Sequence, residues 1–259
     1  MAELTSKRWA AVELTPEAEH AAATATRDFL ERVRKALEEA GNRTDVILEV
    51  PFSDFTAQAL QFLLAAIGTG EVRIVCGNTR AEETGIHGLW RVQEDGIDRF
   101  EVTRLPPFVK ASLSQKMLAL EGLQPPEGAF AAPAILQQLA RAQQSTDLER
   151  VSFDPAYTIE LSRQPLGPAD DHFMSEVLGQ GAIDIGISGF ADANLQSTAM
   201  KGIWRSKIFN KAGKALFDAY VVATLPPEVA NDSDEMAQGA AQCRDALAWI
   251  NEDLDAGRL

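Results

Sequence analysis

The stretch GLWRVQEDGIDRFEVTRLPPFV, Gly88 to Val109, decides the fold because a related stretch returns later in the chain. That second stretch, GIWRSKIFNKAGKALFDAYVVATLPPEV, runs from Gly202 to Val229. Both read Gly, an aliphatic residue, Trp and Arg, then a turn containing Gly, a β-branched stretch and Leu-Pro-Pro-x-Val. Two strands joined by such a turn are typical of a β-hairpin. The sequence therefore predicts the same hairpin twice, with Trp90 and Trp204 as equivalent core anchors.

The similarity extends beyond the hairpins to the segments before them. Gly68-Thr69-Gly70 aligns with Gly179-Gln180-Gly181, and Thr84 aligns with Thr198. The separation between matched residues grows along the chain, as expected when loops accept small insertions. We therefore predict an α+β fold of two tandem repeats, each a small, mostly antiparallel sheet with helices packed on one face.

The composition divides the chain into three parts. The first repeat is expected at 1–120, with an N-terminal helix at 15–40. A Pro-rich linker with a short helix is expected at 121–150, because LQPPEGAFAAPA carries three prolines and one glycine. The second repeat is expected at 151–259, together with a C-terminal helix whose apolar residues recur every three or four positions.

Two further local predictions can be checked in a structure. The helix after the first strand is expected to be capped by Asp54. The segment Ser188–Lys201 is expected to be a long polar loop between strands, with Phe190, Leu195 and Met200 as its apolar points. Loops held on rigid sheets often carry recognition residues, although this one could equally be a plain connector.

The charge and cysteine content exclude several classes of protein. The net charge of −14 disfavours binding to nucleic acid or to an anionic membrane surface. The longest apolar stretch, Ala59 to Ile67, is too short to span a bilayer. The two cysteines, Cys76 and Cys243, cannot form a disulfide framework. We expect a cytoplasmic protein.

The chain offers little for catalysis or metal binding. His20, His87 and His172 are far apart and show no metal-binding spacing, so no metal and no cofactor are expected. The segment GISGF resembles a nucleophile elbow, but a glycine follows Ser188 directly, and no histidine is placed to activate it. We expect no catalytic residue and no enzyme. The alternative is a small hydrolase or transferase with its site at the Ser188–Lys201 loop.

The motifs of the second half resemble those of the HupH or HyaF family of nickel–iron hydrogenase maturation proteins. In that family a glycine-bounded helix end and a strand precede the motif Ser-Arg-Gly-Tyr-Gly-x-Cys-Arg-Ile-x-Ser-Thr, followed by Val-Trp, Tyr-Phe-Asn-Ser and an acidic helix. The resemblance covers about Tyr157 to Trp249. The corresponding residues here are Gly179, Gly181, Gly189, Phe190, Leu195, Ser197, Thr198, Ile203, Trp204, Phe209, Asn210, Leu225 and Pro226. Among the departures from the family, Ser188 and Asn194 stand where it has Arg, and Ala193 where it has Cys.

The resemblance implies an accessory chaperone rather than an enzyme. Such a protein would bind the precursor of the iron–sulfur small subunit of a hydrogenase, together with other maturation factors, before assembly and export. Because Ala193 replaces the cysteine, a packing and recognition role survives here but a thiol role does not. The residues expected to contact the partner are Gly189, Phe190, Leu195, Ser197, Thr198, Trp204, Phe209 and Asn210. A homodimer formed through the apolar stripe of the C-terminal helix is a further option.

Overall fold

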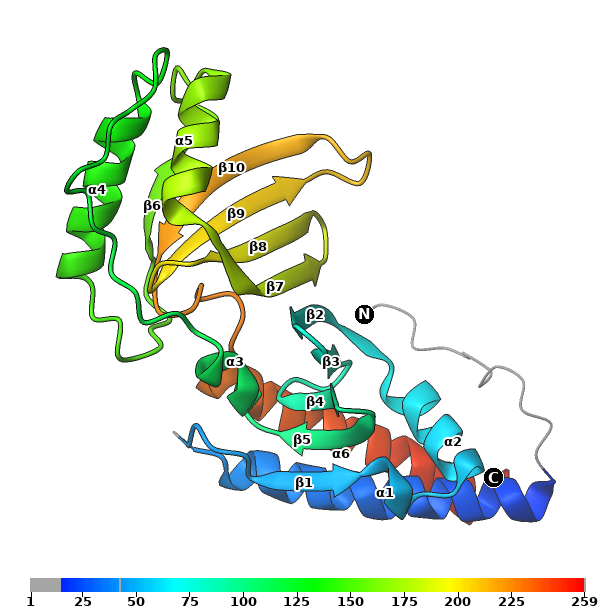
Figure 1. Cartoon of the computed structure of the whole chain (residues 1–259). Helices are drawn as coiled ribbons and strands as arrows, with labels where there is room; N and C mark the ends of the chain where they lie inside the picture. Colours follow the sequence, from blue (N-terminus) through cyan, green and yellow to red (C-terminus); the bar gives the residue numbers. More distant parts are fainter. Residues whose placement is uncertain (1–14, 42, 259) are drawn as a thin grey trace. The chain divides into compact units, whose positions relative to one another are not determined.

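A computed structural model describes residues 15–41 and 43–258. The fold is α+β: the described residues contain six α-helices and ten β-strands, and the strands pair antiparallel (Figure 1). The predicted fold class is therefore confirmed.

The chain runs twice through the same order of elements: helix, strand, helix and four strands. The first series is α1 (Pro16–Glu39), β1 (Leu48–Pro51), α2 (Ala57–Ile67), β2 (Thr69–Cys76), β3 (Thr79–Thr84), β4 (Leu89–Glu94) and β5 (Ile97–Val102). The second series is α4 (Ala132–Ser145), β6 (Tyr157–Glu160), α5 (Pro168–Leu178), β7 (Gln180–Ser188), β8 (Asp192–Thr198), β9 (Ile203–Phe209) and β10 (Ala215–Val222). A 3-10 turn (Phe52–Asp54), α3 (Pro107–Ala111) and α6 (Ser233–Asp255) complete the fold.

The chain forms two compact units whose boundaries differ from the predicted ones. Unit 1 holds the described residues up to Gly70, residues 81–106, and those from Asn231 onward; unit 2 holds 71–80 and 107–230. The C-terminal helix, expected in the second repeat, thus lies in unit 1. The expected linker at 121–150 contains α4, whose apolar face is part of the core of unit 2.

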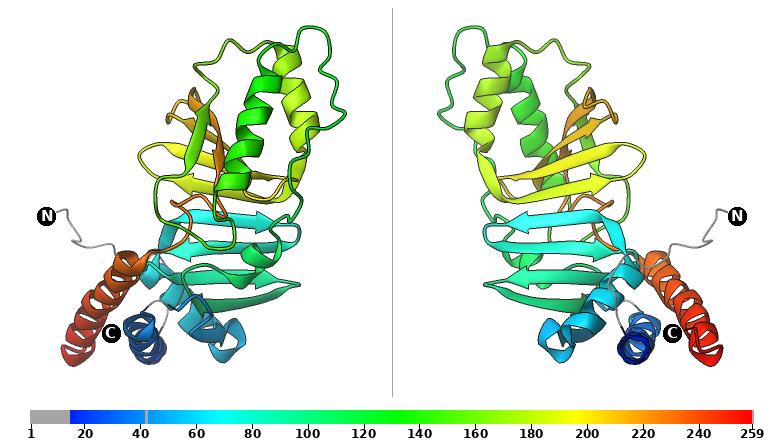
Figure 2. Two further views of the ribbon diagram at one scale, coloured as in Figure 1. Left: turned by 90° about the vertical axis from the view of Figure 1, so that its left-hand side faces the viewer. Right: turned by 90° about the vertical axis from the view of Figure 1, so that its right-hand side faces the viewer.

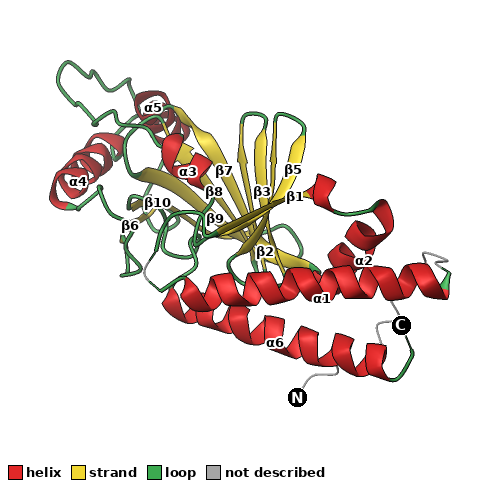
Figure 3. Cartoon of the chain, turned by 90° about the horizontal axis from the view of Figure 1, so that it is seen from below, coloured by secondary structure: helices red, strands yellow, loops and turns green. Residues whose placement is uncertain are grey.

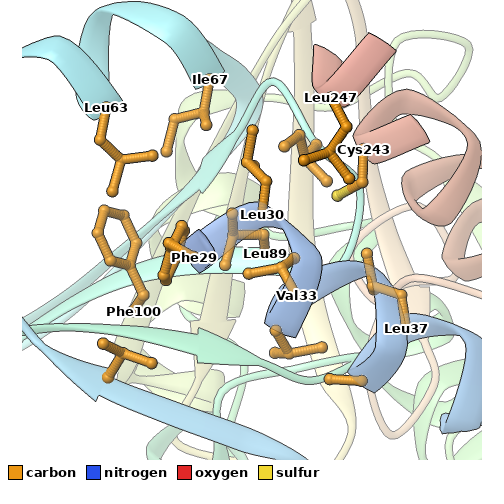
Figure 4. Close-up of a cluster of buried hydrophobic side chains, with 14 of the residues drawn as sticks. Phe29, Leu30, Val33, Leu37, Leu63, Ile67, Leu89, Phe100, Cys243 and Leu247 are labelled. Carbon is orange, nitrogen blue, oxygen red and sulfur yellow. The ribbon is translucent and has the colours of Figure 1, made fainter. Parts of the chain in front are cut away.

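In unit 1, the helices cover one face of the strands β1, β5, β4 and β3, which are neighbours in that order. The helix α1 starts as its sequence predicts, because the side chain of Thr15 accepts a hydrogen bond from the backbone N–H of Ala18 at 3.3 Å. Its apolar face meets side chains from α2, the sheet and α6 (Figure 4). The core includes Phe29, Leu30, Val33, Leu37, Leu63, Ile67, Leu89, Phe100, Cys243 and Leu247.

The helix α6 packs along α1 within unit 1 (Figure 3). Its predicted apolar stripe is the buried face, from Met236 to Ile250, each residue at most 5% exposed. The approach is close, because a Cβ built at Gly239 would lie 2.1 Å from the carbonyl oxygen of His87. The stripe is therefore filled by the chain's own core and does not serve as a dimer surface.

In unit 2, the strands follow the order β2, β7, β8, β9, β10 and β6, and α4 and α5 lie beside each other on one face (Figure 2). The core between helices and sheet includes Ile135, Leu139, Met174, Tyr220 and Val222.

Two local predictions were wrong. Residues 192–198 are a strand, not part of a loop, so the segment Ser188–Lys201 consists mainly of a short turn followed by β8; the matching segment 79–84 is also a strand. Their signal is weak because β3 carries charged residues and Leu195 is the one large apolar residue of β8. Asp54 does not cap α2 either: Thr56 is the N-cap, and its side chain accepts from the N–H of Ala59 at 3.2 Å.

The two series also share side-chain contacts at matched positions. The hydroxyl of Thr84 accepts from the N–H of Ile86 and lies 3.0 Å from the carbonyl of Leu89. The hydroxyl of Thr198 makes the same contacts with Met200 and Ile203, the latter at 2.8 Å.

The two tryptophans also make equivalent hydrogen bonds in the two series. The indole N–H of Trp90 donates to the carbonyl of Thr103 at 3.0 Å, and that of Trp204 donates to the carbonyl of Ala223 at 3.2 Å. Both tryptophans are buried, as predicted. These contacts support the tandem duplication, which itself stays a prediction.

Candidate partner-binding site

The turn between β7 and β8 presents an aromatic side chain to solvent. Phe190 is 102% exposed, which means that no residue of 15–41 or 43–258 covers its ring. Its neighbour Gly189 lies against the carboxylate of Glu71, at 3.1 Å from where a Cβ would be. A larger residue would have to push that carboxylate aside.

The turn between β9 and β10 lies at the same end of the sheet. The side-chain oxygen of Asn210 accepts from the backbone N–H groups of Ala212 and Lys214, at 3.0 and 2.9 Å, and so fixes the turn. The ammonium of Lys211 pairs with Asp192, at the start of β8, at 2.7 Å. We call Gly189, Phe190, Phe209 and Asn210 the hairpin-tip surface.

The other four predicted contact residues are inside unit 2. Leu195 and Trp204 are 0% and 1% exposed, so neither can touch a partner. The hydroxyl of Ser197 accepts from the N–H of Ile183 at 2.9 Å, and Thr198 closes the turn described above. The structure thus separates the eight predicted residues into a surface group and a supporting group, a difference that the sequence motif does not reveal.

In the part of the chain that it describes, the structure does not gather reactive side chains around Ser188, as the alternative of a hydrolase or transferase site would require. Ser188 is exposed at the end of β7, opposite Asp192 in the sheet register, and lines neither of two hollows in unit 2. Cys243 is also unsuited to chemistry, because burial raises the pKa of its thiol to about 12.

One of these hollows, which we call the polar hollow, lies between α5 and the sheet and has a volume of about 340 Å³. It borders Ser197 and Thr198, but most of its walls are residues that the sequence analysis did not single out. Its lining is Asp171, Ser175, Leu178, Gly179, Gln180, Gln196, Ser197, Thr198, Arg205, Lys207 and Tyr220.

Arg205 is the best-anchored charge of the polar hollow. Its guanidinium donates to Asp218 at 2.5 and 2.7 Å, to Asp171 at 3.1 Å and to the hydroxyl of Tyr220 at 2.9 Å. It also lies over the ring of Tyr220, 4.8 Å from the centroid. Burial alone would lower the pKa of Arg205, but the bonds to Asp218 outweigh it and the pKa is raised. The Trp-Arg pair that opens both hairpins was the sequence signal for this residue.

The second hollow, about 490 Å³, runs between α5 and the segment 116–124 and has a mixed lining that includes Phe173 and Met200. Among the described residues, no three His, Cys, Asp or Glu side chains are grouped so as to hold a metal ion. Within that same part of the chain, none of the helices is both long and apolar enough to cross a membrane.

Comparison with known proteins shows which family the sequence resembles. Residues 129–250 match the conserved C-terminal region of the HupH hydrogenase expression protein. The chain is 30% identical over 202 residues to the hydrogenase expression/formation protein HupQ of Azotobacter chroococcum mcd 1, covering 73% of this chain and 70% of that protein. It is 22% identical over 218 residues to the hydrogenase-1 operon protein HyaF of Escherichia coli K12, covering 80% and 74%.

Among solved structures, the hydrogenase expression protein HupH from Thiobacillus denitrificans matches 47% of this chain and 95% of its own, with 29% identity and a TM-score of 0.39.

Proposed function

This chain belongs to the HupH family of hydrogenase expression proteins, and from that premise we propose that it is a chaperone of nickel–iron hydrogenase maturation. In this proposal it binds the precursor of the iron–sulfur small subunit in the cytoplasm, before assembly and export, and acts by contact rather than by catalysis. Other maturation factors join the same complex. The observation that carries the proposal is the fully exposed ring of Phe190 on a rigid sheet.

A bare aromatic ring suits a protein contact better than a catalytic role. An exposed phenyl group costs free energy in water, which is recovered when a partner buries it. Phe190 extends from two antiparallel strands, and the ion pair of Lys211 with Asp192 joins its turn to the next one. The surface is therefore held ready before the partner arrives, which reduces the entropy lost on binding.

The buried members of the family motif support this surface from below. Leu195 fills the core, and the hydroxyl of Ser197 ties β8 to β7 through the backbone N–H of Ile183. Neither role requires a thiol at position 193, where Ala193 is the second residue of β8. The loss of the family cysteine is therefore compatible with a role in recognition.

The charge of the chain favours a basic region of the partner. At −14, the chain attracts a basic export peptide over a distance of about 10 Å at 0.1 M salt. The acidic start of α6 is a poor place for this contact, because Asp232 and Glu235 are engaged in a capping box. We expect the attraction to come from the summed charge, so rising salt should slow association.

The test is a binding measurement with the purified small-subunit precursor. Phe190→Ser removes the exposed ring, and Phe130→Ser is the matched control, because Phe130 is also a largely exposed phenylalanine of unit 2, at 88%. The proposal predicts that F190S weakens binding about tenfold or more, as is usual for an aromatic anchor, while F130S leaves it unchanged. Equal affinities for the wild type and F190S would rule out the hairpin-tip surface as the contact.

A further inference from the structure

The polar hollow of unit 2 holds more hydrogen-bond donors than free acceptors. Asp218 gives both carboxylate oxygens to Arg205, and Asp171 gives one. The hydroxyl of Tyr220 accepts from Arg205 at 2.9 Å. Burial is the main cause that raises the pKa of Tyr220, so the phenol keeps its proton and can donate it. The Asp218 carboxylate is thus fully occupied and Asp171 is half occupied, while several donors remain.

Lys207 is the donor that most clearly lacks a partner. It is partly buried and lies directly opposite Asp218 in the β9–β10 register. Asp218, however, is held by Arg205, and no group in the described part of the chain forms a hydrogen bond or ion pair with the Lys207 ammonium. The side-chain amides of Gln180 and Gln196 are likewise unbonded within those residues. An unpaired ammonium beside free amides provides an environment for an anion.

The first series of elements shows that this hollow is not required by the fold. The helices α2 and α5 both have eleven residues, and each ends at a glycine with positive φ, so they align position by position. Where α5 has Asp171 and Ser175, α2 has Leu60 and Leu64, which pack against the core of unit 1. Polar residues thus replace apolar ones at the positions that line the hollow.

The same comparison holds on the sheet. Counting from the matched residues Thr84 and Thr198, Gln196 corresponds to Glu82. The hollow thus carries a neutral amide where the first series carries a carboxylate. This amide is as large as a carboxylate, but it adds no negative charge beside Arg205 and Lys207 and can donate a hydrogen bond.

From these observations we propose that the polar hollow binds a carboxylate-bearing ligand, with Lys207 as the charged contact and Gln180, Gln196 and Tyr220 as neutral donors. The volume of about 340 Å³ suits a small acid or one acidic side chain of a peptide. The net charge of −14 repels anions at long range, so recognition depends on these short contacts. The site is separate from the hairpin-tip surface, and its test involves no hydrogenase subunit.

The test uses two probes and the intact chain. Succinate represents a free small acid, and the blocked tripeptide acetyl-Ala-Glu-Ala-amide represents an acidic side chain, with its Gln analogue as the neutral control. Binding is followed by the NMR signals of the side-chain amides of Gln180 and Gln196. We expect a saturable shift of both signals with at least one acidic probe and none with the neutral peptide. A shift with the peptide alone identifies a peptide ligand, and a shift with succinate identifies a small acid.

Three variants test whether the change in the NMR signals comes from a ligand bound in the polar hollow. Lys207→Gln removes the unpaired ammonium and should weaken binding about tenfold. Lys214→Gln, at an exposed lysine of the β9–β10 turn, is the matched control and should change nothing. Ser175→Leu introduces the leucine found in α2 and should abolish binding while the chain stays folded.

The proposal is overturned if neither acidic probe gives a saturable shift. It is also overturned if K207Q and K214Q weaken binding equally, since this would show attraction to general surface charge. Retained binding in folded S175L would place the ligand elsewhere and would contradict the proposal as well.

Discussion

Glu83, at the end of β3, is a carboxylate buried in unit 1 at 5% exposure. One of its oxygens accepts from the side-chain amide of Asn231 at 2.8 Å, and the ring of His87 lies 3.6 Å from the same oxygen. Burial is the largest influence and raises the pKa of Glu83, although Asn231 and His87 oppose it. Folding therefore makes it harder for this group to ionise.

The raised pKa predicts how this group affects stability as the pH changes. Between its ordinary pKa of 4.5 and the raised pKa of the folded state, the unfolded chain has mostly lost the proton of Glu83 while the folded chain mostly still holds it. Its contribution to the free energy of unfolding therefore falls as the pH rises through that window.

Glu83→Gln keeps the carbonyl oxygen facing Asn231 and removes the titration. Urea unfolding of E83Q and the wild type should show a difference in stability that grows in favour of E83Q as the pH rises above 4.5. A difference that stays constant with pH would contradict the assignment.

The contact residues illustrate what a sequence motif can and cannot show at this scale. Trp204 and Phe190 belong to the same family motif, and both are aromatic. One donates its indole N–H inside the core and the other is fully exposed. Composition alone cannot separate the two roles, because exposure depends on which strand face and which turn each residue occupies.

At the scale of elements, the docking of α6 in unit 1 depends on a glycine. Gly239 is buried, and a Cβ there would lie 2.1 Å from the carbonyl oxygen of His87, far inside van der Waals contact. The N–H of His87 also donates to the side chain of Gln242 at 3.0 Å, which ties the same turn to α6. Backbone and helix thus meet directly at this point.

The substitution Gly239→Ala has two effects of opposite sign on the free energy of unfolding. Helix propensity alone predicts a gain of about 1 kcal/mol in the free energy of unfolding. The clash with a backbone atom that cannot rotate away predicts a loss of about 2 kcal/mol, and we expect the clash to win. Urea unfolding and hydrogen exchange of α6 measure both the sign and the place of the change. A G239A variant more stable than the wild type would contradict this packing.

The elements also show why some predictions from sequence succeeded. The helix α1, predicted at 15–40, and the apolar stripe of α6 depend on local residues: Thr15 caps the first, and the three-and-four spacing marks the second. The strands β3 and β8 depend on pairing with their neighbours, and neither carries a run of apolar residues. The unit to which α6 belongs depends on a contact between distant segments, which its own sequence does not encode.

At the scale of the whole molecule, the tandem duplication is a prediction that two matched turns can test. Thr84 and Thr198 make the same hydrogen bonds in different units, with the residues two and five positions later. Two copies of one turn should respond alike when the hydroxyl is removed.

The variants Thr84→Val and Thr198→Val are therefore expected to lose similar amounts of stability, about 1–3 kcal/mol each, because each leaves buried backbone groups unbonded. The losses should add in the double variant, since the two sites share no partner. Urea unfolding followed by tryptophan fluorescence measures them. A large loss at one site and almost none at the other would show that the two turns are not equivalent.

The central claim is that the whole chain works by contact and not by catalysis. The most direct measurement compares Ser188→Ala with Phe190→Ser in cells whose own copy of the gene has been deleted, with assembled, active hydrogenase as the readout. We predict that S188A restores hydrogenase fully and that F190S, present at an equal level, restores much less. Loss of hydrogenase in S188A together with full restoration by F190S would contradict the claim.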